Sequence, residues 1–315
     1  MSQMENGQFL TADPKMFRIL QVARNIANSR ASVMLYGESG CGKEMFAKFI
    51  HQNSSRTVRR MHTVSCSAIP ESQLEIEMFG VEANGFGNGT TKQGAIERAN
   101  DSTLLIKDIE KLPLHLQAKL LRVLQEGEVE RIGGKTTHKV NIRLIASSKV
   151  SLRECVAQGK FREDLFYRLN IIPIEIPALR NRPKDIDLLT KHFIAVYCLM
   201  NAKNPIQISE EALAKLRLWT WPGNVRELEN LIERLVLLTN TSVILPEHLN
   251  SPAPSSKAND RQLKAGMTIH EAERRLILTT LDYTNQNRTK AAKMLGISIR
   301  TLRNKLNEYR EVNAI

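Results

Sequence analysis

The first half of the chain alternates short apolar runs with amphipathic segments. The runs are rich in β-branched and other apolar residues, and the one at 103–106 is typical of a parallel strand that is covered on both faces. Between the runs, apolar residues recur at helical spacing. Strands that alternate with helices predict an α/β fold with a doubly wound parallel sheet. The predicted strands are 32–36, 61–66, 103–106, 141–146 and 171–174, and the predicted helices include 16–29, 45–50 and 114–125.

The pattern changes in the second half of the chain. It becomes wholly helical over 184–249, which predicts a separate small lid on the α/β part. A polar stretch rich in Pro and Ser follows at 251–256 and is typical of a linker. The last fifty residues form a third, helical unit. We place the α/β subdomain at 1–178, the helical lid at 179–249, the linker at 250–266 and the all-α unit at 267–315.

Charge is the feature of the composition that changes this picture. The 315 residues carry a formal net charge of +12, with a pI near 9.6, which favours a polyanionic partner, nucleic acid first. A merely solubilising surface charge is the alternative. The four cysteines show no metal-ligand spacing, and we assign no metal ligand. Because the sequence has neither a signal peptide nor an apolar run of about 20 residues, we expect a cytoplasmic protein without a membrane contact.

A glycine-rich loop stands between the first predicted strand and the helix that follows it. In such a loop, backbone N–H groups and a helix N-terminus face an anion, and Lys43 adds a charge for the β- and γ-phosphates. Glu44 occupies the position at which the phosphate-binding motif has a Ser or Thr that holds magnesium. The match to this motif is therefore weaker than a complete one. We expect ATP to be bound by Gly37, Glu38, Ser39, Gly40, Cys41, Gly42, Lys43 and Glu44.

The C-terminal unit predicts a helix-turn-helix. Two short helices, at 288–295 and from Ser298 to about Tyr309, are joined by a tight turn that contains Gly296. Seven basic side chains stand against one acidic side chain between 288 and 310, a cluster that a helical oligomerisation domain would not explain. We expect a core of Ala291, Ala292, Leu295, Ile297, Leu302 and Leu306, and contacts to double-stranded DNA from Arg288, Lys290, Ser298, Arg300, Thr301, Arg303, Asn304 and Lys305.

With these pieces, almost the whole chain resembles the AAA+ transcription activators of sigma-54, the bacterial enhancer-binding proteins with a Fis-type helix-turn-helix. The matching segments are 37–44, 71–80, 161–170 and 221–228. The resemblance implies a ring-forming ATPase in which Arg162 and Arg168 act as arginine fingers toward a neighbouring subunit and Arg226 senses bound phosphate. Residues 299–306 are similar to the flagellar-gene regulators of the family.

The same resemblance exposes departures from the family pattern. Lys107 stands where an Asp organises magnesium, and Asp108 is one methylene shorter than the usual catalytic Glu. Ser65 replaces an Asn, and Ser148-Lys149 replaces the first-sensor Thr-Asn. The glycine-dense segment 81–89 predicts a loop, and its sigma-contacting tip carries Gly85, Phe86 and Gly87, with Gly87 in place of Thr.

These departures predict a DNA-binding regulator that binds ATP, with magnesium binding and the contact to sigma-54 RNA polymerase impaired and hydrolysis weak or absent. Asp108, Arg162 and Arg168 are its catalytic candidates. Three alternatives stay open: slow turnover supported by Asp108 if Lys107 swings away, a fully active ATPase that remodels sigma-54 polymerase, and a nucleotide-dependent scaffold. We expect self-association as a dimer or ring, including rings mixed with an intact paralogue. Since the AAA+ module begins within the first twenty residues, we expect no N-terminal receiver domain.

Overall fold

The chain folds into two compact units, residues 1–250 and 251–315. The structure is a computed structural model. It describes residues 9–83, 91–239, 241–250 and 287–311, together with residues 268, 270, 273, 274, 276, 277, 280, 281 and 284. The sigma-contacting tip predicted at 85–87 lies outside the described residues. The finer boundaries that the sequence suggests, at 178 and 266, stay predictions.

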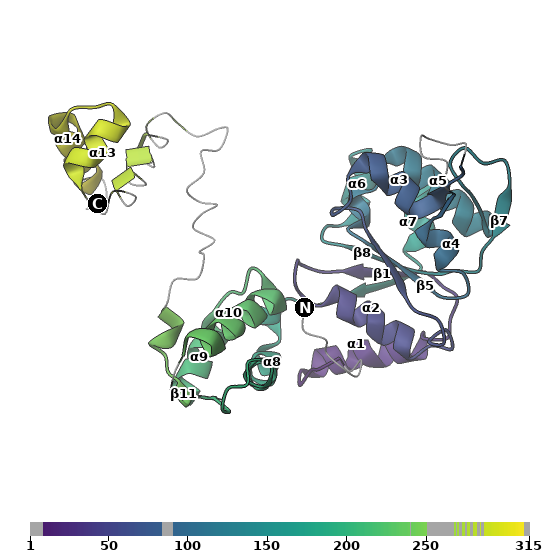
Figure 1. The fold of residues 1–315 in the computed structure, drawn as a ribbon, viewed down its shortest axis with the longest axis horizontal. Helices are drawn as coiled ribbons and strands as arrows, with labels where there is room; N and C mark the ends of the chain where they lie inside the picture. The colour runs from purple at the N-terminus through teal and green to yellow at the C-terminus, as the bar shows by residue number, and fades with distance from the viewer. Residues whose placement is uncertain are drawn as a thin grey trace. The chain divides into compact units, whose positions relative to one another are not determined.

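The first unit is built on a parallel sheet of five strands in the order β2-β5-β8-β1-β9, as the apolar pattern predicts (Figure 1). Central strands are buried on both faces, which explains why they read as nearly continuous apolar runs. The five strands are β1 Val33–Tyr36, β2 His62–Ser65, β5 Thr103–Lys107, β8 Arg143–Ser148 and β9 Ile172–Glu175.

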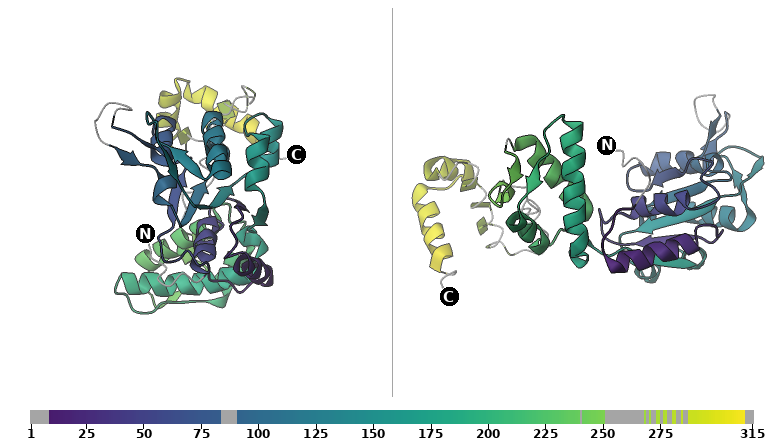
Figure 2. Two further views of the ribbon diagram at one scale, coloured as in Figure 1. Left: turned by 90° about the vertical axis from the view of Figure 1, so that its right-hand side faces the viewer. Right: turned by 90° about the horizontal axis from the view of Figure 1, so that it is seen from below.

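Helices cover both faces of this sheet, and the alternation of side chains along each strand divides the core between them (Figures 1 and 2). In β5, Leu104 and Ile106 pack on one side, whereas Leu105 packs on the other. Helices α1 Pro14–Asn25 and α2 Lys43–Gln52 cover the Leu105 face. The opposite face is covered by α3 Glu71–Phe79, α4 Ala95–Arg98, α5 Leu114–Glu126, α6 Leu152–Ala157 and α7 Glu163–Leu169.

Two small antiparallel strand pairs and one short 3-10 helix complete the α/β part, and a second 3-10 helix, whose Leu179 packs in the lid core, leads into the lid. They lie in connections where the sequence predicts no strand. The strand pairs are β3 Gly80–Val81 with β4 Lys92–Gln93, and β6 Glu128–Glu130 with β7 Thr137–Lys139. The 3-10 helices are η1 Ile109–Lys111 and η2 Leu179–Asn181.

The lid packs three helices around a core of its own, which includes the fully buried Trp221. The prediction of a wholly helical segment is wrong in one detail, because two-residue strands pair in parallel within it. Runs this short carry no periodicity that a sequence pattern could reveal. The lid elements are α8 Pro183–Met200, β10 Gln207–Ile208, α9 Glu210–Leu218, α10 Asn224–Leu238, β11 Val243–Ile244 and η3 His248–Asn250.

The second unit contains helices α13 Arg288–Leu295 and α14 Ile299–Glu311. Asn287 caps the first helix by accepting a hydrogen bond from the backbone of Lys290, and Gly296 ends it with a φ of 67°. All six core residues expected from the sequence lie in its apolar cluster, which also contains Ile277 and Leu281. The predicted helix-turn-helix is therefore confirmed.

Candidate functional site

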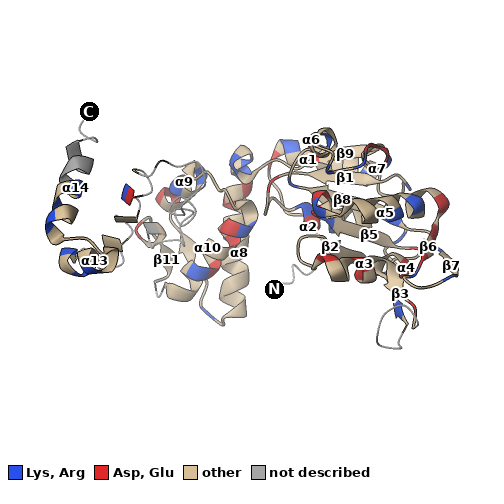
Figure 3. Ribbon diagram, turned by 90° about the horizontal axis from the view of Figure 1, so that it is seen from above, with Lys and Arg blue, Asp and Glu red and all other residues tan. Residues whose placement is uncertain are grey.

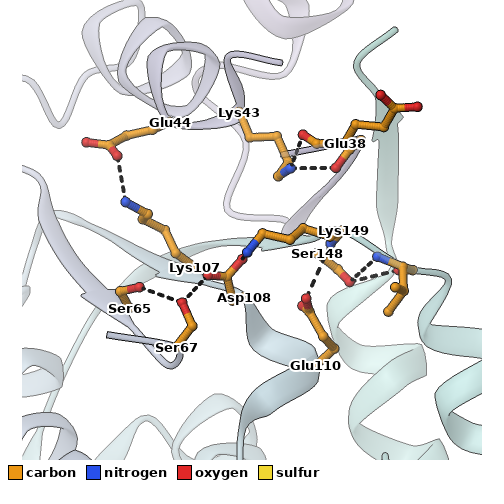
Figure 4. Close-up of polar contacts among 12 residues, drawn as sticks. Glu38, Lys43, Glu44, Ser65, Ser67, Lys107, Asp108, Glu110, Ser148 and Lys149 are labelled. Carbon is orange, nitrogen blue, oxygen red and sulfur yellow. Dashed lines mark hydrogen bonds and ion pairs between the residues drawn. The ribbon is translucent and has the colours of Figure 1, made fainter. Parts of the chain in front are cut away.

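The glycine-rich loop connects β1 to α2 along the edge where the parallel strands end. An L side chain is excluded at Gly40, because its φ is 75° and an added Cβ would lie 2.2 Å from the carbonyl oxygen of Gly223. The ammonium of Lys43 donates to the carbonyl oxygens of Gly37 and, at 2.8 Å, Glu38 (Figure 4). Burial lowers the pKa of Lys43. The predicted phosphate-binding loop therefore has the expected strand–loop–helix geometry.

Lys107 lies at the end of β5 and forms an ion pair with Glu44 in the first turn of α2. The distance from Lys107 Nζ to Glu44 Oε2 is 2.7 Å, and the other carboxylate oxygen of Glu44 lies 3.3 Å from Lys48 Nζ. Although burial alone would raise the pKa of Glu44, the ion pair with Lys107 brings it below its ordinary value. The two residues that depart from the bare magnesium pattern thus neutralise each other (Figure 4).

Asp108 follows directly and is 7% exposed. Its carboxylate accepts a hydrogen bond from Ser67 and forms an ion pair with Lys149, with 3.0 Å between Oδ1 and Nζ. Burial opposes ionisation, but these two contacts lower the pKa of Asp108 below its ordinary value. Ser65, on β2, lies 3.4 Å from the hydroxyl of Ser67. Lys149, which stands where the family pattern has Asn, is thus the ion-pair partner of Asp108 (Figure 4).

A cavity of about 440 Å³ connects the loop, these strand ends and the lid. Its basic lining side chains outnumber the acidic ones, so the cavity favours an anion. The basic side chains are Lys43, Lys48, Lys107, Lys149 and Arg226, and the acidic ones are Glu44, Asp108 and Glu229.

The lid is fastened to the loop by the N-terminus of α10. Buried Asn224 donates to Glu38 Oε2 and to the carbonyl oxygen of Ser39, at 3.0 Å each, and accepts from the backbone N–H of Leu179 at 2.7 Å. The N–H of Val225 donates to the carbonyl oxygen of Gly40 at 3.1 Å. Sequence reasoning singles out Arg226 in this segment and misses Asn224. Its φ of 53° lies in the left-handed region that Asn tolerates.

Glu38 gains a further partner that the sequence does not suggest. Arg180 forms a two-point contact with its carboxylate, one oxygen lying 2.8 Å from Arg180 Nη1. The hydrogen bonds from Arg180 and Asn224 lower the pKa of Glu38 to about 2. The carboxylate therefore stays ionised at neutral pH and links the loop to both η2 and α10.

The two arginine-finger candidates lie elsewhere. Arg162 and Arg168, at the two ends of α7, are exposed and are not among the residues that line the cavity. Arg162 pairs with Asp164 at 2.7 Å, and Arg168 donates to the carbonyl oxygen of Leu124 at 2.8 Å. Their predicted action on a neighbouring subunit stays a prediction.

Most of the DNA-contact candidates are exposed. Ser298 also caps α14 by accepting from the N–H of Thr301 at 3.0 Å. Lys305 differs, since it is half-buried and forms an ion pair with Glu273 at 2.7 Å. The exposed candidates are Arg288, Lys290, Ser298, Arg300, Thr301, Arg303 and Asn304.

Comparison with protein families assigns the three parts. Residues 9–175 match the Sigma-54 interaction domain, 180–265 the AAA+ ATPase lid domain, and 268–309 the Fis family of bacterial regulatory proteins. This chain belongs to the sigma-54-dependent transcriptional activators. It is a DNA-binding transcriptional regulator with an ATP-binding AAA+ domain. No helix within the described residues is long and apolar enough to span a bilayer.

Two curated relatives illustrate the similarity. The regulatory protein AtoC of Escherichia coli is 46% identical over 314 residues, which cover 96% of this chain and 68% of AtoC. The transcriptional regulatory protein FlbD of Caulobacter vibrioides is 43% identical over 314 residues, covering 94% of this chain and 69% of FlbD. The chain thus spans about two thirds of the length of these relatives.

Solved structures show a similarity over the same length of the chain. NtrX from Brucella abortus matches with a TM-score of 0.74 at 32% identity over 95% of this chain and 68% of NtrX. NtrX in complex with ATP matches with a TM-score of 0.73 at 31% identity over 96% of this chain and 69% of NtrX.

Proposed function

We propose that this chain is a sequence-specific DNA-binding regulator that binds ATP and hydrolyses it weakly or not at all. One observation carries the proposal: the two carboxylates that line the cavity beside the glycine-rich loop and the end of β5 are each paired with a lysine. Glu44 pairs with Lys107, and Asp108 pairs with Lys149. A catalytic base needs a carboxylate within hydrogen-bond reach of the attacking water. Asp108 is instead fixed by Ser67 and Lys149.

A magnesium ion does not fit this set of side chains. Magnesium requires oxygen ligands in near-octahedral geometry, and an ammonium group cannot coordinate it. Beside nucleotide phosphates, magnesium needs one or two carboxylate ligands, and the two candidates here, Glu44 and Asp108, are each engaged by a lysine. The residues that bind ATP in this proposal are the loop 37–44 and Arg226, which lines the cavity from the lid.

The rest of the mechanism is proposed from the family pattern. Gly87 in place of Thr weakens the contact to sigma-54, so the chain acts as a co-regulator or repressor at its DNA sites, in the cytoplasm. Self-association as a dimer or ring, including rings mixed with an intact paralogue, would let Arg162 and Arg168 reach a neighbouring subunit. The second candidate is a fully active ATPase that remodels sigma-54 polymerase. The ATP-binding fold and the exposed position of both arginines support it.

Phosphate release from ATP, measured with Mg²⁺ and DNA present, tests the proposal. We expect turnover close to that of Lys43→Ala, which removes the loop ammonium. A restored variant carries Ser65→Asn, Lys107→Asp, Asp108→Glu and Lys149→Asn. We expect its turnover to exceed that of the unmodified chain by about 100-fold or more, because a positioned base contributes about 10²- to 10⁴-fold.

AtoC, measured alongside, provides the reference rate. A rate in the unmodified chain comparable to that of AtoC, and abolished by Lys43→Ala, would overturn the proposal and establish the second candidate.

A further inference from the structure

We infer that this chain binds ATP as the metal-free nucleotide, with the ammonium groups of Lys107 and Lys149 supplying the positive charge that magnesium supplies in related ATPases. The inference rests on the ATP binding proposed above and goes beyond it, because it names the ionic form of the ligand. It follows from three properties of the cavity: the change in fixed charge, the position of the two ammonium groups, and the state of the carboxylates.

The change in fixed charge is close to that of a magnesium ion. Relative to the family pattern, Lys107 in place of Asp raises the side-chain charge by two units, and Lys149 in place of Asn raises it by one. A magnesium ion would contribute two. The substitutions therefore provide, as part of the chain, at least the charge that the metal would bring to the triphosphate.

Both ammonium groups lie where they can meet a ligand in the cavity. Lys107 and Lys149 line it together with Lys43, and their side chains are 31% and 42% exposed. Lys107 lies at 2.7 Å from Glu44, the residue that follows the phosphate-binding Lys43. An ammonium group has three N–H donors, so each lysine can keep its carboxylate partner and still donate to a phosphate oxygen.

The carboxylates are the reason why the metal complex binds less well. A magnesium ion that entered with the nucleotide would meet Glu44 and Asp108, each already engaged by a lysine. To gain a carboxylate ligand, it would have to displace an ammonium group and remain beside it. Two cations a few ångströms apart repel strongly in a partly buried site. Free ATP carries more negative charge than its magnesium complex and meets no such repulsion.

Fluorescence titration with N-methylanthraniloyl-ATP compares the two forms directly, once in EDTA and once in millimolar MgCl₂. We expect the dissociation constant in EDTA to be equal to or lower than that in MgCl₂. Binding about tenfold or more tighter in MgCl₂ than in EDTA would overturn the inference.

Variants of the full chain sharpen the result. Lys107→Asp should reverse the preference, weakening binding in EDTA by about tenfold or more, the size of one charge-assisted hydrogen bond, while MgCl₂ restores it. Lys149→Asn should shift the preference in the same direction by a smaller factor. Lys135→Met, a change at an exposed lysine outside the cavity lining, should leave both constants unchanged. Equal effects of Lys107→Asp and Lys135→Met would contradict the inference.

The outcomes separate this inference from the proposed function. Tight binding that requires Mg²⁺, without phosphate release, would remove the inference and leave the lost hydrolysis intact. Binding in EDTA together with rapid Mg²⁺-dependent phosphate release would do the reverse. Absence of binding in both solutions would remove the inference and ATP binding together. If Lys107→Asp does not fold, as judged by circular dichroism, the comparison of the unmodified chain in the two solutions still decides.

Discussion

The nucleotide cavity and the helix-turn-helix hold their basic side chains in opposite ways. In the cavity, Lys107 and Lys149 are each paired with a carboxylate from another element. In the helix-turn-helix, Arg300 and Arg303 are exposed, and the structure gives them no ion pair with any residue that it describes. Figure 3 marks Lys and Arg positions in blue along both α13 and α14. The same residue types are therefore already paired with a carboxylate in the cavity, whereas Arg300 and Arg303 have no such partner among the described residues of the helix-turn-helix.

This contrast bears on the meaning of the net charge of +12. A lysine that neutralises a carboxylate inside a cavity can still donate to a ligand bound beside it, but it adds little to the long-range field that attracts a polyanion. An unneutralised surface arginine contributes to that field fully. Basic composition alone cannot separate the two cases. Removal of an unpaired arginine should weaken DNA binding strongly, removal of a paired lysine should weaken it little, and removal of a contact between the loop and the lid should lower stability.

The largest effect is expected for the double variant Arg300→Ala/Arg303→Ala. Each residue can contact a base edge or a phosphate, and each contact contributes about 1–3 kcal/mol, so DNA affinity should fall by about 100-fold or more. The slope of log affinity against log salt should decrease in magnitude by up to about two. Fluorescence anisotropy with duplex DNA at several salt concentrations measures both, and the melting temperature should not change.

Lys305→Met is the matched comparison. Because Lys305 pairs with Glu273, its removal should weaken DNA binding by less than about threefold. An effect as large as that of the arginines would show that the ion pair between Lys305 and Glu273 opens on DNA. An ion pair in the free chain would then not mark a basic side chain as unavailable to DNA.

Asn224→Ala is expected to act on stability. It removes the hydrogen bonds to Glu38, Ser39 and Leu179 and places Ala at a φ of 53°. Unpaired buried groups and left-handed backbone together should cost about 3 kcal/mol. The melting temperature of the first unit should fall by about 6–12 °C in a thermal scan.

Asn224→Gly removes the same hydrogen bonds without the backbone cost and should recover about 1 kcal/mol. Equal melting temperatures for Asn224→Ala and the unmodified chain would show that this amide does not hold the lid on the loop.

The smallest effect concerns pH. The pKa of Glu38 is about 2 in the folded chain and 4.5 in the unfolded chain. The ionised carboxylate therefore stabilises the fold above pH 4.5. That contribution should be lost as the pH falls from 4.5 toward 2. Because the pair with Arg180 is largely exposed, its size should not exceed about 1 kcal/mol. Melting temperatures of Glu38→Gln and the unmodified chain should converge over this range. Glu163→Gln, a change at another exposed glutamate, should run parallel to the unmodified chain.

Much of the fold could be predicted because its signals are local. The five parallel strands follow from apolar runs, and the six core residues of the helix-turn-helix follow from helical spacing around Gly296. The strand pairs β3–β4, β6–β7 and β10–β11 were missed. With only two or three residues in each strand, they show no alternation strong enough to read.

The candidate site could be predicted only as a set of positions. The sequence identifies Lys107, Asp108 and Lys149 as departures, but it leads us to expect simple repulsion from the lysine. It does not reveal that Glu44, 63 residues away, is its partner. Such a pair depends on the register of β5 beside the loop and on the side-chain conformations of both residues. A positively charged residue at a strand end opposite a glutamate after the loop lysine is the signal that could have suggested it.

One main-chain hydrogen bond links the glycine-rich loop directly to the lid. The hydrogen bond from the N–H of Val225 to Gly40 involves no side chain, so most replacements at 225 leave it in place. At 40, by contrast, any Cβ would collide with Gly223. Opening of the lid therefore exposes the amide hydrogen of Val225 to solvent. Its rate of exchange with deuterium reports, at a single atom, whether the loop is engaged.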